Sequence, residues 1–309
     1  MRSKNRILHD EMKNKSEILS QRRDFFIQNM KTVAIQGVKG AYHEVAARKF
    51  FEDKGAGEID ICPCIYFKDV IEFVKNNPDG IGIMAIENTI AGSLLQNHEL
   101  IRRSDLVVFG EQKIRITHSF AALHGQKLED LTEVNSHPIA LMQCGDYLNA
   151  HPWIKVVESE DTALSAQEIA EKQLKGHAAI CSRYAAELYG LNVLDEGIET
   201  NKRNFTRFLL LANRAQAEEL LDKSKISKSS IVFTLPHTEG SLSKVLTILS
   251  FYDVNLTKIQ SLPVIGREWE YLFYVDVTFA EVQKYRQGLE AIRPLTNDLK
   301  ILGEYESEL

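Results

Sequence analysis

The sequence predicts an α/β domain followed by a smaller α+β module, and three observations carry the prediction. From residue 30 to about residue 213, short apolar segments alternate with amphipathic segments, which is the pattern of alternating strands and helices. Residues 230–305 follow the order strand, helix, strand, strand, helix, strand, which is typical of a ferredoxin-like βαββαβ module. Residues 214–229 between them are polar and poor in aromatic residues, so we expect a linker there.

The first domain, residues 30–213, is expected to contain seven strands joined by helices. Apolar runs place the strands at 32–36, 81–86, 111–123, 132–136, 155–158, 177–181 and 206–212. Helices are clearest at 43–52, 138–150 and 162–175. The strand at 111–123 is long for a single sheet, so we expect it to cross between two subdomains that leave a cleft between them.

The second domain, residues 230–309, is expected to contain four strands and two helices. The strands are placed at 230–235, 255–264, 270–279 and 300–305, and the helices at 240–251 and 281–292. Modules of this order often pair edge to edge. We therefore expect a homo-oligomer, either a dimer or a tetramer.

Composition narrows the class of partner. The formal net charge of −6 disfavours nucleic acid or an anionic membrane as a partner, but it permits a small anionic substrate. The cysteines lack the spacing of a redox or zinc motif, so we expect reduced thiols and no metal site; they are Cys62, Cys64, Cys144 and Cys181. The chain has neither a long apolar run nor an apolar export signal, which favours a cytoplasmic protein.

The N-terminal extension, residues 1–29, differs from the rest of the chain. It carries seven Lys or Arg residues against four Asp or Glu residues, and it contains few strand formers. A solvated helix, a disordered arm and a segment upstream of a true start at Met30 all remain open for it. Its acidic residues make a mitochondrial presequence a poor match.

Polar side chains gather at four junctions where a predicted strand gives way to a helix. In open α/β sheets ligands bind outside the carboxyl ends of the strands. A tight turn or a helix cap explains each junction taken singly, but together they would line the cleft. The four groups are Gly37 with Gly40; Glu87, Asn88 and Thr89; Ser136 and His137 with Gln143; and Glu160, Asp161 and Thr162.

The stretch NFTRFLLLA, residues 204–212, places polar residues at the mouth of an apolar strand. Threonine is β-branched and suits a strand, which alone would explain Thr206. Because side chains alternate across a strand, Arg207 is expected on the face opposite Thr206, where a structural ion pair is favoured.

With these stretches the chain resembles the prephenate dehydratase family, whose members carry a C-terminal ACT regulatory domain. The resemblance extends from Met30 to about Tyr305 and rests on five ordered motifs. They are Gly37-Val-Lys-Gly40-Ala-Tyr42, Ile86-Glu87-Asn88-Thr89-Ile-Ala-Gly92-Ser93, Ser136-His137-Pro138 with Gln143-Cys144, Asp161-Thr162-Ala163, and Asn204-Phe205-Thr206-Arg207-Phe208.

The resemblance implies a fold like that of type II periplasmic binding proteins and the conversion of prephenate to phenylpyruvate, water and carbon dioxide in phenylalanine biosynthesis. No cofactor is implied, because aromatisation of the ring drives the elimination. We expect the Thr206 hydroxyl to donate to the departing oxygen, with a protonated Glu87 or Glu160 as the proton source. By resemblance the catalytic residues are Thr206, Glu87 and Glu160, and the substrate-binding residues are Asn88, Thr89, Ser136, Gln143, Gly40, Tyr42 and Arg207.

The resemblance also implies a phenylalanine site in the ACT domain. Gln260 and Leu262 stand where the family has Glu and Arg, which puts the strength of inhibition in doubt. The regulatory residues implied are Gly240, Ser241, Leu242, Asn255, Gln260, Ser261, Leu262 and Pro263. Arogenate dehydratase, a solute-binding protein of the same fold and a non-catalytic amino-acid sensor remain alternatives, and 29 residues are too few for the chorismate mutase domain that some relatives carry.

Overall fold

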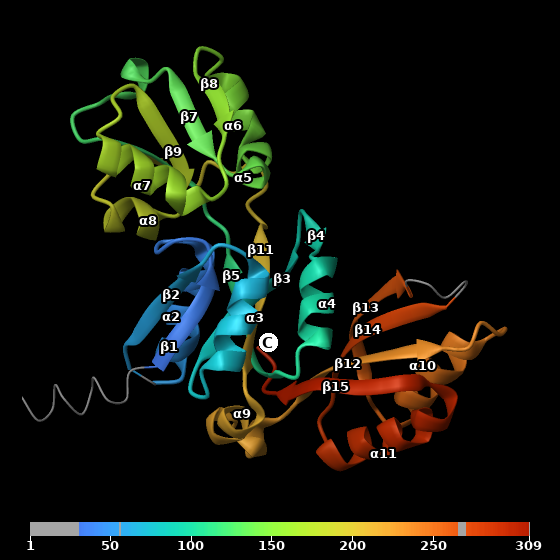
Figure 1. Cartoon of the computed structure of the whole chain (residues 1–309). Helices are drawn as coiled ribbons and strands as arrows, with labels where there is room; N and C mark the ends of the chain where they lie inside the picture. The colour runs from blue at the N-terminus through green and yellow to red at the C-terminus, as the bar shows by residue number, and fades with distance from the viewer. Residues whose placement is uncertain (1–30, 56, 265–269, 309) are drawn as a thin grey trace, which may run out of the picture.

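The computed structural model describes residues 31–55, 57–264 and 270–308, which form three sheets with helices packed against them (Figure 1). Two sheets belong to two α/β lobes, and the third belongs to the C-terminal module. The predicted N-terminal extension lies outside the described residues. No described helix is long and apolar enough to cross a membrane.

The first lobe is built on a mixed sheet of order β2-β1-β3-β11-β5, with the short β4 paired to β3. β1 runs parallel to β2 and β3, whereas β11 runs antiparallel to both β3 and β5. The strands are β1 (Lys31–Gln36), β2 (Ile59–Cys64), β3 (Ile81–Asn88), β4 (Gly92–Ser93), β5 (Val107–Arg115) and β11 (Phe205–Ala212). The helices are α2 (Tyr42–Asp53), α3 (Phe67–Asn76), α4 (Leu95–Arg103) and α9 (Arg214–Leu220).

The central strand β11 is apolar on both faces because both faces are covered. Phe208 and Leu210 lie in the core that contains α2. Leu209 and Leu211 lie in the opposite core, together with residues of α3 and of the C-terminal module. This double burial explains why the sequence reads as a continuous apolar run there.

The second lobe has a sheet of order β10-β6-β9-β7-β8. Its strands are β6 (Ser119–Ala122), β7 (Glu133–Ser136), β8 (Lys155–Glu158), β9 (His177–Cys181) and β10 (Asn192–Glu196). Its helical elements are η1 (Leu128–Asp130), α5 (Pro138–Gln143), α6 (Gly145–Ala150), α7 (Thr162–Lys172) and α8 (Arg183–Leu188). The helix expected at 138–150 is divided, because the backbone at Cys144 leaves the helical region.

Two chain segments join the lobes. The single strand expected at 111–123 is wrong as one strand: β5 ends at Arg115, β6 begins at Ser119, and the two belong to different sheets. The crossing that this strand was expected to make is present. Residues 197–204 make the return crossing, and the Ile116 N–H donates to the Asn204 carbonyl at 2.8 Å, which ties the two segments together.

The C-terminal module has the expected βαββαβ order, with an antiparallel sheet of order β13-β14-β12-β15. The core beneath it includes buried residues of both module helices. Its elements are β12 (Lys228–Leu235), α10 (Ser241–Phe251), β13 (Asn255–Pro263), β14 (Tyr271–Thr278), α11 (Val282–Ile292), η3 (Arg293–Leu295) and β15 (Asn297–Tyr305).

The residues expected to be a linker at 214–229 contain α9, η2 (Lys223–Lys225) and the start of β12 instead. Ala217 is buried and Leu220 packs against the core of the first lobe, so this segment is held in place by apolar contact. The polar composition of this segment therefore did not reveal that it contains a short amphipathic helix.

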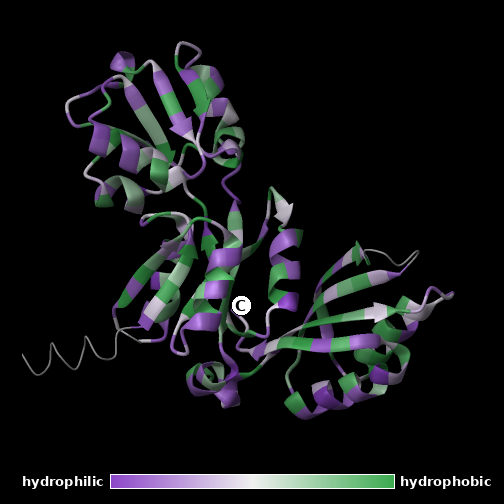
Figure 2. Cartoon of the chain, viewed as in Figure 1, coloured by the Kyte–Doolittle hydropathy of each residue, from purple (hydrophilic) through white to green (hydrophobic). Residues whose placement is uncertain are grey.

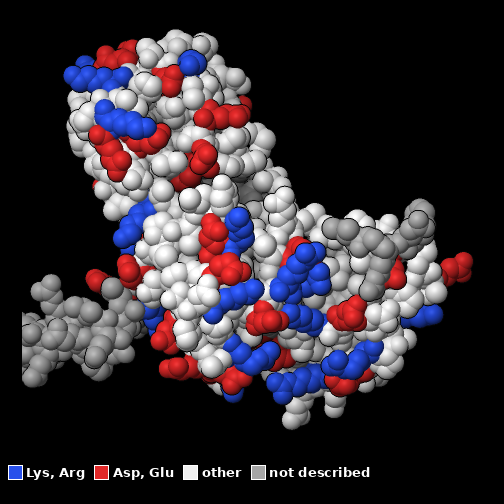
Figure 3. All heavy atoms as spheres, viewed as in Figure 1, with Lys and Arg blue, Asp and Glu red and all other residues white. Residues whose placement is uncertain are grey.

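The other face of the module sheet packs on the first lobe. Tyr274, Leu302 and Tyr305 share a core with Ile86 and Leu209. Figure 2 shows hydrophobic residues along the strands and a mostly hydrophilic outer side of α4. Figure 3 shows Lys and Arg interspersed with Asp and Glu over the viewed face, with no basic patch there.

Candidate active site

A cleft of about 430 Å³ lies between the two lobes. The first lobe lines it with residues of α2, β3 and β11, and the second lobe lines it with residues of α5 and of the turn before α7. No Lys or Arg of the described chain lines this cleft. Its polar lining consists of Gln36, Tyr42, His43, Asn88, His118, His137, Gln143, Asp161, Thr162 and Thr206.

At the base of the cleft, β3 and β11 place Asn88 directly beside Thr206. The Asn88 amide oxygen accepts the backbone N–H groups of Ile90 and Ala91 at 2.9 and 2.8 Å, so its Nδ2 must be the donor. Nδ2 donates to the Thr206 hydroxyl at 2.9 Å. Because this bond occupies a lone pair of the hydroxyl, the Thr206 proton remains available to a ligand.

The fixed donor-to-acceptor direction of these hydrogen bonds extends toward the second lobe. Asn88 Nδ2 also donates to Asn204 Oδ1 at 2.8 Å, and Asn204 Nδ2 donates to Gln143 Oε1 at 2.8 Å. Gln143 Oε1 lies 2.9 Å from His118 Nε2, which therefore carries the proton. Burial lowers the pKa of His118, which favours its neutral ring. Its Nδ1 lies 3.1 Å from the Tyr42 hydroxyl, which donates its one proton to the Thr117 carbonyl at 2.7 Å. This chain of hydrogen bonds joins both lobes across the cleft.

Two helices of eleven or more residues begin at the cleft, α2 after Ala41 and α7 after Asp161. The N-terminus of a helix presents unpaired backbone N–H groups and a partial positive charge. His137 adds a side-chain donor, because its Nδ1 accepts the Ile139 N–H at 3.2 Å and the ring proton must then sit on Nε2 when the ring is neutral. The cleft can thus receive an anion without a cationic side chain.

An apolar floor lies beside these donors. The His43 ring meets Phe208 and Phe67 edge to face, with centroids 5.0 and 5.5 Å apart. Its Nε2 accepts the Ala85 N–H at 3.2 Å, and burial lowers its pKa to about 4, so the ring is neutral.

Among the described residues, Asp161 is the carboxyl group that lines the cleft. Its Oδ1 caps α7 by accepting the N–H groups of Ala163 and Leu164 at 2.8 and 3.0 Å. Burial raises the pKa of Asp161 above its usual 3.8, against the opposing effect of these two bonds. Both cap bonds end on Oδ1, while Oδ2 lies beside Gly37, where an added Cβ would come within 2.8 Å of it.

Four of the residues expected at the site line the cleft, namely Thr206, Asn88, Gln143 and Tyr42. Six others do not. Glu87 faces the C-terminal module, where Lys258 Nζ lies 3.0 Å from its carboxylate, and Glu160 is exposed beyond the cleft. Arg207 lies behind the strand, as alternation predicts, and forms an ion pair with Glu111, so it does not bind in the cleft.

The other three serve local structure. The buried Ser136 hydroxyl donates to the Ile180 carbonyl at 2.5 Å. Thr89 accepts the Phe205 N–H and donates to the Arg203 carbonyl, each at 3.0 Å, so it fastens the return crossing. The Gly40 N–H donates to Glu44 at 2.7 Å, and its φ of +93° suits the glycine in that turn.

Sequence reasoning placed His137 and Asp161 at junctions expected to line the cleft but gave neither a chemical role, and it did not assign His43, His118 or Asn204 to the site. His137, Asn204 and Asp161 stand inside the motifs quoted above, but a cap or a strand explained each of them. His43 and His118 lie outside those motifs, and only the folded structure shows that they line the cleft. No cluster of three or more metal-ligating side chains occurs in the described part of the chain.

The residues expected to bind an effector lie on the module. Gly240 precedes α10 with a φ of +73°, and the Ser241 hydroxyl donates to the Thr238 carbonyl at 2.9 Å. Asn255, Gln260, Ser261, Leu262 and Pro263 all lie on β13, which is an edge strand of the module sheet.

Comparison with known proteins agrees with this geometry. The family model for prephenate dehydratase matches residues 33–216. "Arogenate dehydratase 2" of Petunia hybrida is 36% identical over 292 residues, which cover 89% of this chain and 72% of that relative.

Two solved structures share the fold over almost their whole length. Prephenate dehydratase from Arthrobacter aurescens in complex with L-Phe has a TM-score of 0.78 and 26% identity, and covers 89% of this chain and 90% of its own. GqqA, described as a quorum quenching acylase, has a TM-score of 0.79 and 27% identity, and the match covers 90% of this chain and 98% of that chain. The chain therefore belongs to the prephenate dehydratase family.

Proposed function

We propose that this chain converts prephenate to phenylpyruvate, water and carbon dioxide. The observation that carries the proposal is the hydrogen bond from Asn88 to Thr206, whose polarity leaves the threonine proton free at the base of the cleft. The start of α2 and the His137 ring supply donors for substrate carboxylates, whereas the N–H groups of Ala163 and Leu164 at the start of α7 are already paired with Asp161. Phe67 and Phe208 supply the floor for the ring.

In the reaction the bond between the ring and its carboxylate breaks, carbon dioxide leaves, and the electron pair moves into the ring. The C–O bond at the opposite carbon breaks at the same time, and the departing oxygen takes a proton to leave as water. The Thr206 hydroxyl donates a hydrogen bond to this oxygen. Asp161 replaces Glu87 and Glu160 as the carboxyl that can supply the proton, since it lines the cleft and burial raises its pKa.

The test is the formation of phenylpyruvate from prephenate by the purified chain, against a blank without enzyme. Thr206→Val keeps the shape of the side chain and removes the hydroxyl. We expect kcat to fall by about 10²- to 10⁴-fold, the usual range for loss of a positioned proton donor. Thr206→Ser, which retains the hydroxyl, is the matched control and should lose far less. Turnover by Thr206→Val close to that of the wild type would exclude the role of the hydroxyl.

Arogenate is a second candidate substrate, and Asp161 is the observation that favours it. Arogenate carries an ammonium group where prephenate carries a keto group, and an ionised Asp161 could accept a hydrogen bond from that ammonium. Parallel assays with both substrates decide between them. If neither yields an aromatic product, the proposed reaction is wrong.

We infer that the C-terminal module is an ACT-type regulatory domain that binds phenylalanine. Its βαββαβ order supports the inference, as does the L-Phe complex of the Arthrobacter relative. The two lobes joined by two crossings also support a fold like that of type II periplasmic binding proteins. Titration calorimetry with phenylalanine tests the effector, and a flat titration would remove it. Sedimentation with and without phenylalanine tests the expected dimer or tetramer.

A further inference from the structure

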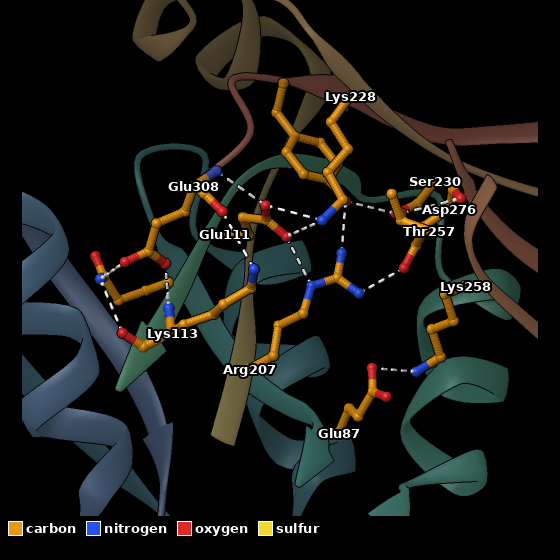
Figure 4. Close-up of polar contacts among 12 residues, drawn as sticks. Glu87, Glu111, Lys113, Arg207, Lys228, Ser230, Thr257, Lys258, Asp276 and Glu308 are labelled. Atoms are coloured by element: carbon orange, nitrogen blue, oxygen red, sulfur yellow. Dashed lines mark hydrogen bonds and ion pairs between the residues drawn. The ribbon is translucent and has the colours of Figure 1, made fainter. Parts of the chain in front are cut away.

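The two strands at the base of the cleft carry charged residues immediately next to the two central polar ones. Asn88 and Thr206 face the cleft, while Glu87 on β3 and Arg207 on β11 face the C-terminal module, because neighbouring side chains of a strand point to opposite faces. Figure 4 shows Glu87 and Arg207 reaching toward residues of the module.

Arg207 is held in a buried cluster of alternating charge. Its Nε donates to Glu111 of the first lobe at 2.6 Å, and its Nη1 donates to Asp276 on β14 of the module. Lys228 on β12 also pairs with Glu111, at 2.8 Å. The side chains of Arg207, Glu111, Asp276 and Lys228 are each at most 10% exposed. Two positive and two negative charges thus balance in a dry interface.

Further hydrogen bonds fix the module side of this cluster. The Ser230 hydroxyl donates to Asp276 Oδ1 at 2.5 Å, and Arg207 Nη2 donates to the Tyr305 hydroxyl at 3.0 Å. Both carboxylate oxygens of Asp276 are therefore engaged. Arg207 cannot shift without breaking contacts in two domains.

Glu87 forms the second connection. Its carboxylate lies 3.0 Å from Lys258 Nζ on β13, and the Lys258 side chain is 9% exposed. Strand alternation puts Lys258, Gln260 and Leu262 on one face of β13, and Leu262 packs against the core shared with the first lobe. The stretch proposed to bind the effector therefore includes the residue that holds Glu87.

Backbone irregularity occurs where these connections meet the cleft. The pairing of β3 with β11 shifts register between Arg207 and Phe208, next to Thr206. Such bulges re-aim side chains beside active sites. A displacement of Glu87 or Arg207 is thus passed by one peptide unit to Asn88 or Thr206, whose hydrogen bond is 2.9 Å long.

We propose that Glu87 and Arg207 are positioning residues through which Lys258 and Asp276 of the module set the hydrogen bond between Asn88 and Thr206. This inference rests on the proposed function, and it gives Glu87 a role other than proton donor. It also supplies the physical route by which an effector bound on β13 would change turnover.

A double-mutant cycle tests the Glu87 connection. Glu87→Gln and Lys258→Met are each expected to lower kcat by about 3- to 30-fold, the range for residues that couple sites without touching the substrate. The double variant should be no slower than the slower single variant, because both changes remove one interaction. Lys155→Met is the matched control, since it breaks a Lys–Glu pair of 3.1 Å in the second lobe and should leave kcat unchanged.

Two patterns would overturn the proposal. If Glu87 donated the proton itself, Glu87→Gln would lose more than about 10²-fold while Lys258→Met stayed near the wild type. If the module did not set the hydrogen bond, both single variants would match Lys155→Met. Thermal unfolding of each variant checks that the fold is retained.

A second readout does not depend on turnover. In protein labelled with ¹³C at threonine methyl groups, the Thr206 signal is identified by its loss in Thr206→Ser. We expect this signal to shift in Lys258→Met and in Asp276→Asn, but not in Lys155→Met. An unmoved signal would refute the coupling, whereas a shifted signal in an enzyme inactive on both substrates would refute only the proposed reaction.

Discussion

At the scale of single residues, the orientation of one amide decides the chemistry of the cleft. Two backbone N–H groups fix the oxygen of Asn88, so the nitrogen must face Thr206. Any change that keeps the oxygen but replaces the nitrogen therefore reverses the hydrogen bond to Thr206.

Asn88→Asp makes this change with almost no alteration of shape. The carboxylate keeps its bonds to the Ile90 and Ala91 N–H groups, but its second oxygen accepts the Thr206 proton and withdraws it from the substrate. We expect kcat to fall by at least about 10²-fold with KM nearly unchanged, because an interaction of the transition state is lost. Steady-state kinetics on prephenate checks the split between the two constants. A variant that raised KM alone would show that Asn88 only binds the substrate.

Some of the site residues could be predicted at this scale and some could not. Alternation along β11 was enough to place Arg207 away from Thr206. The same rule applies to Glu87 and Asn88, which are also neighbours, yet the motif led to both being placed in the site. The contact between Asn204 and Gln143 joins residues 61 positions apart, so it depends on how the lobes close and leaves no local pattern.

At the scale of elements, β15 lies against β5 at a point where only hydrogen fits. A Cβ added at Gly303 would overlap the carbonyl oxygen of Val108. The φ of Gly303 is not in the left-handed region, so the requirement for glycine there comes from space alone.

Gly303→Val is expected to push the module away from the first lobe. Forcing a side chain into a packed contact costs about 1–3 kcal/mol or more, and this contact is with rigid backbone. We expect differential scanning calorimetry to show a lower first transition, with the module separating before the lobes unfold. Gly145→Val, at a glycine with open space around it and a φ outside the left-handed region, controls for the general cost of replacing a glycine. A single transition at the wild-type temperature would show that the added side chain does not push the module away from the first lobe.

Helices and strands were predicted well where the spacing of apolar residues is regular. They were predicted poorly where tertiary packing, rather than this spacing, decides where a strand ends. The order of the C-terminal module follows from its alternation of strand and helix patterns. The division of 111–123 at residues 116–118 was not visible, because Ile116 and Thr117 continue the alternation of apolar and polar residues. In the structure the His118 N–H donates to the Glu199 carboxylate at 3.0 Å rather than to a strand of the first sheet.

At the scale of the whole molecule, the buried charges between the first lobe and the module make its stability depend on pH. Burial opposes ionisation of Asp276, but Arg207 and Ser230 outweigh it and hold the pKa of this carboxyl below its usual 3.8. Arg207 and Lys228 hold the pKa of Glu111 below 4.5 against the same effect of burial. A carboxyl with a lowered pKa stabilises the fold above its unfolded pKa, and the contribution is lost as the pH falls toward the folded pKa.

Asp276→Asn removes one charge of the cluster and should show this dependence directly. At pH 7 we expect a loss of about 3–5 kcal/mol in the free energy of unfolding, because Arg207 loses one of its two carboxylate partners and the buried cluster is left with an excess positive charge. The difference from the wild type should begin to narrow as the pH falls below about 4, where the carboxyl of Asp276 takes up a proton in the unfolded chain, and it should disappear only below the lowered pKa of the folded state. Urea unfolding at pH 7, 5 and 3.5 measures the difference in the free energy of unfolding between the variant and the wild type. The same difference at all three pH values would assign the loss to packing rather than to charge.

The sheet order of the first lobe has a consequence for how the chain is made. β11 lies between β3 and β5, but it follows the entire second lobe in the sequence. A ribosome therefore releases β3 and β5 first, then the contiguous residues of the second lobe, and only then the strand that fills the gap. Since domains fold largely in the order of synthesis, the second lobe can close on itself while the first still has an open slot. Thr206 enters its position near the end of this process, so the cleft is assembled around the last strand to arrive.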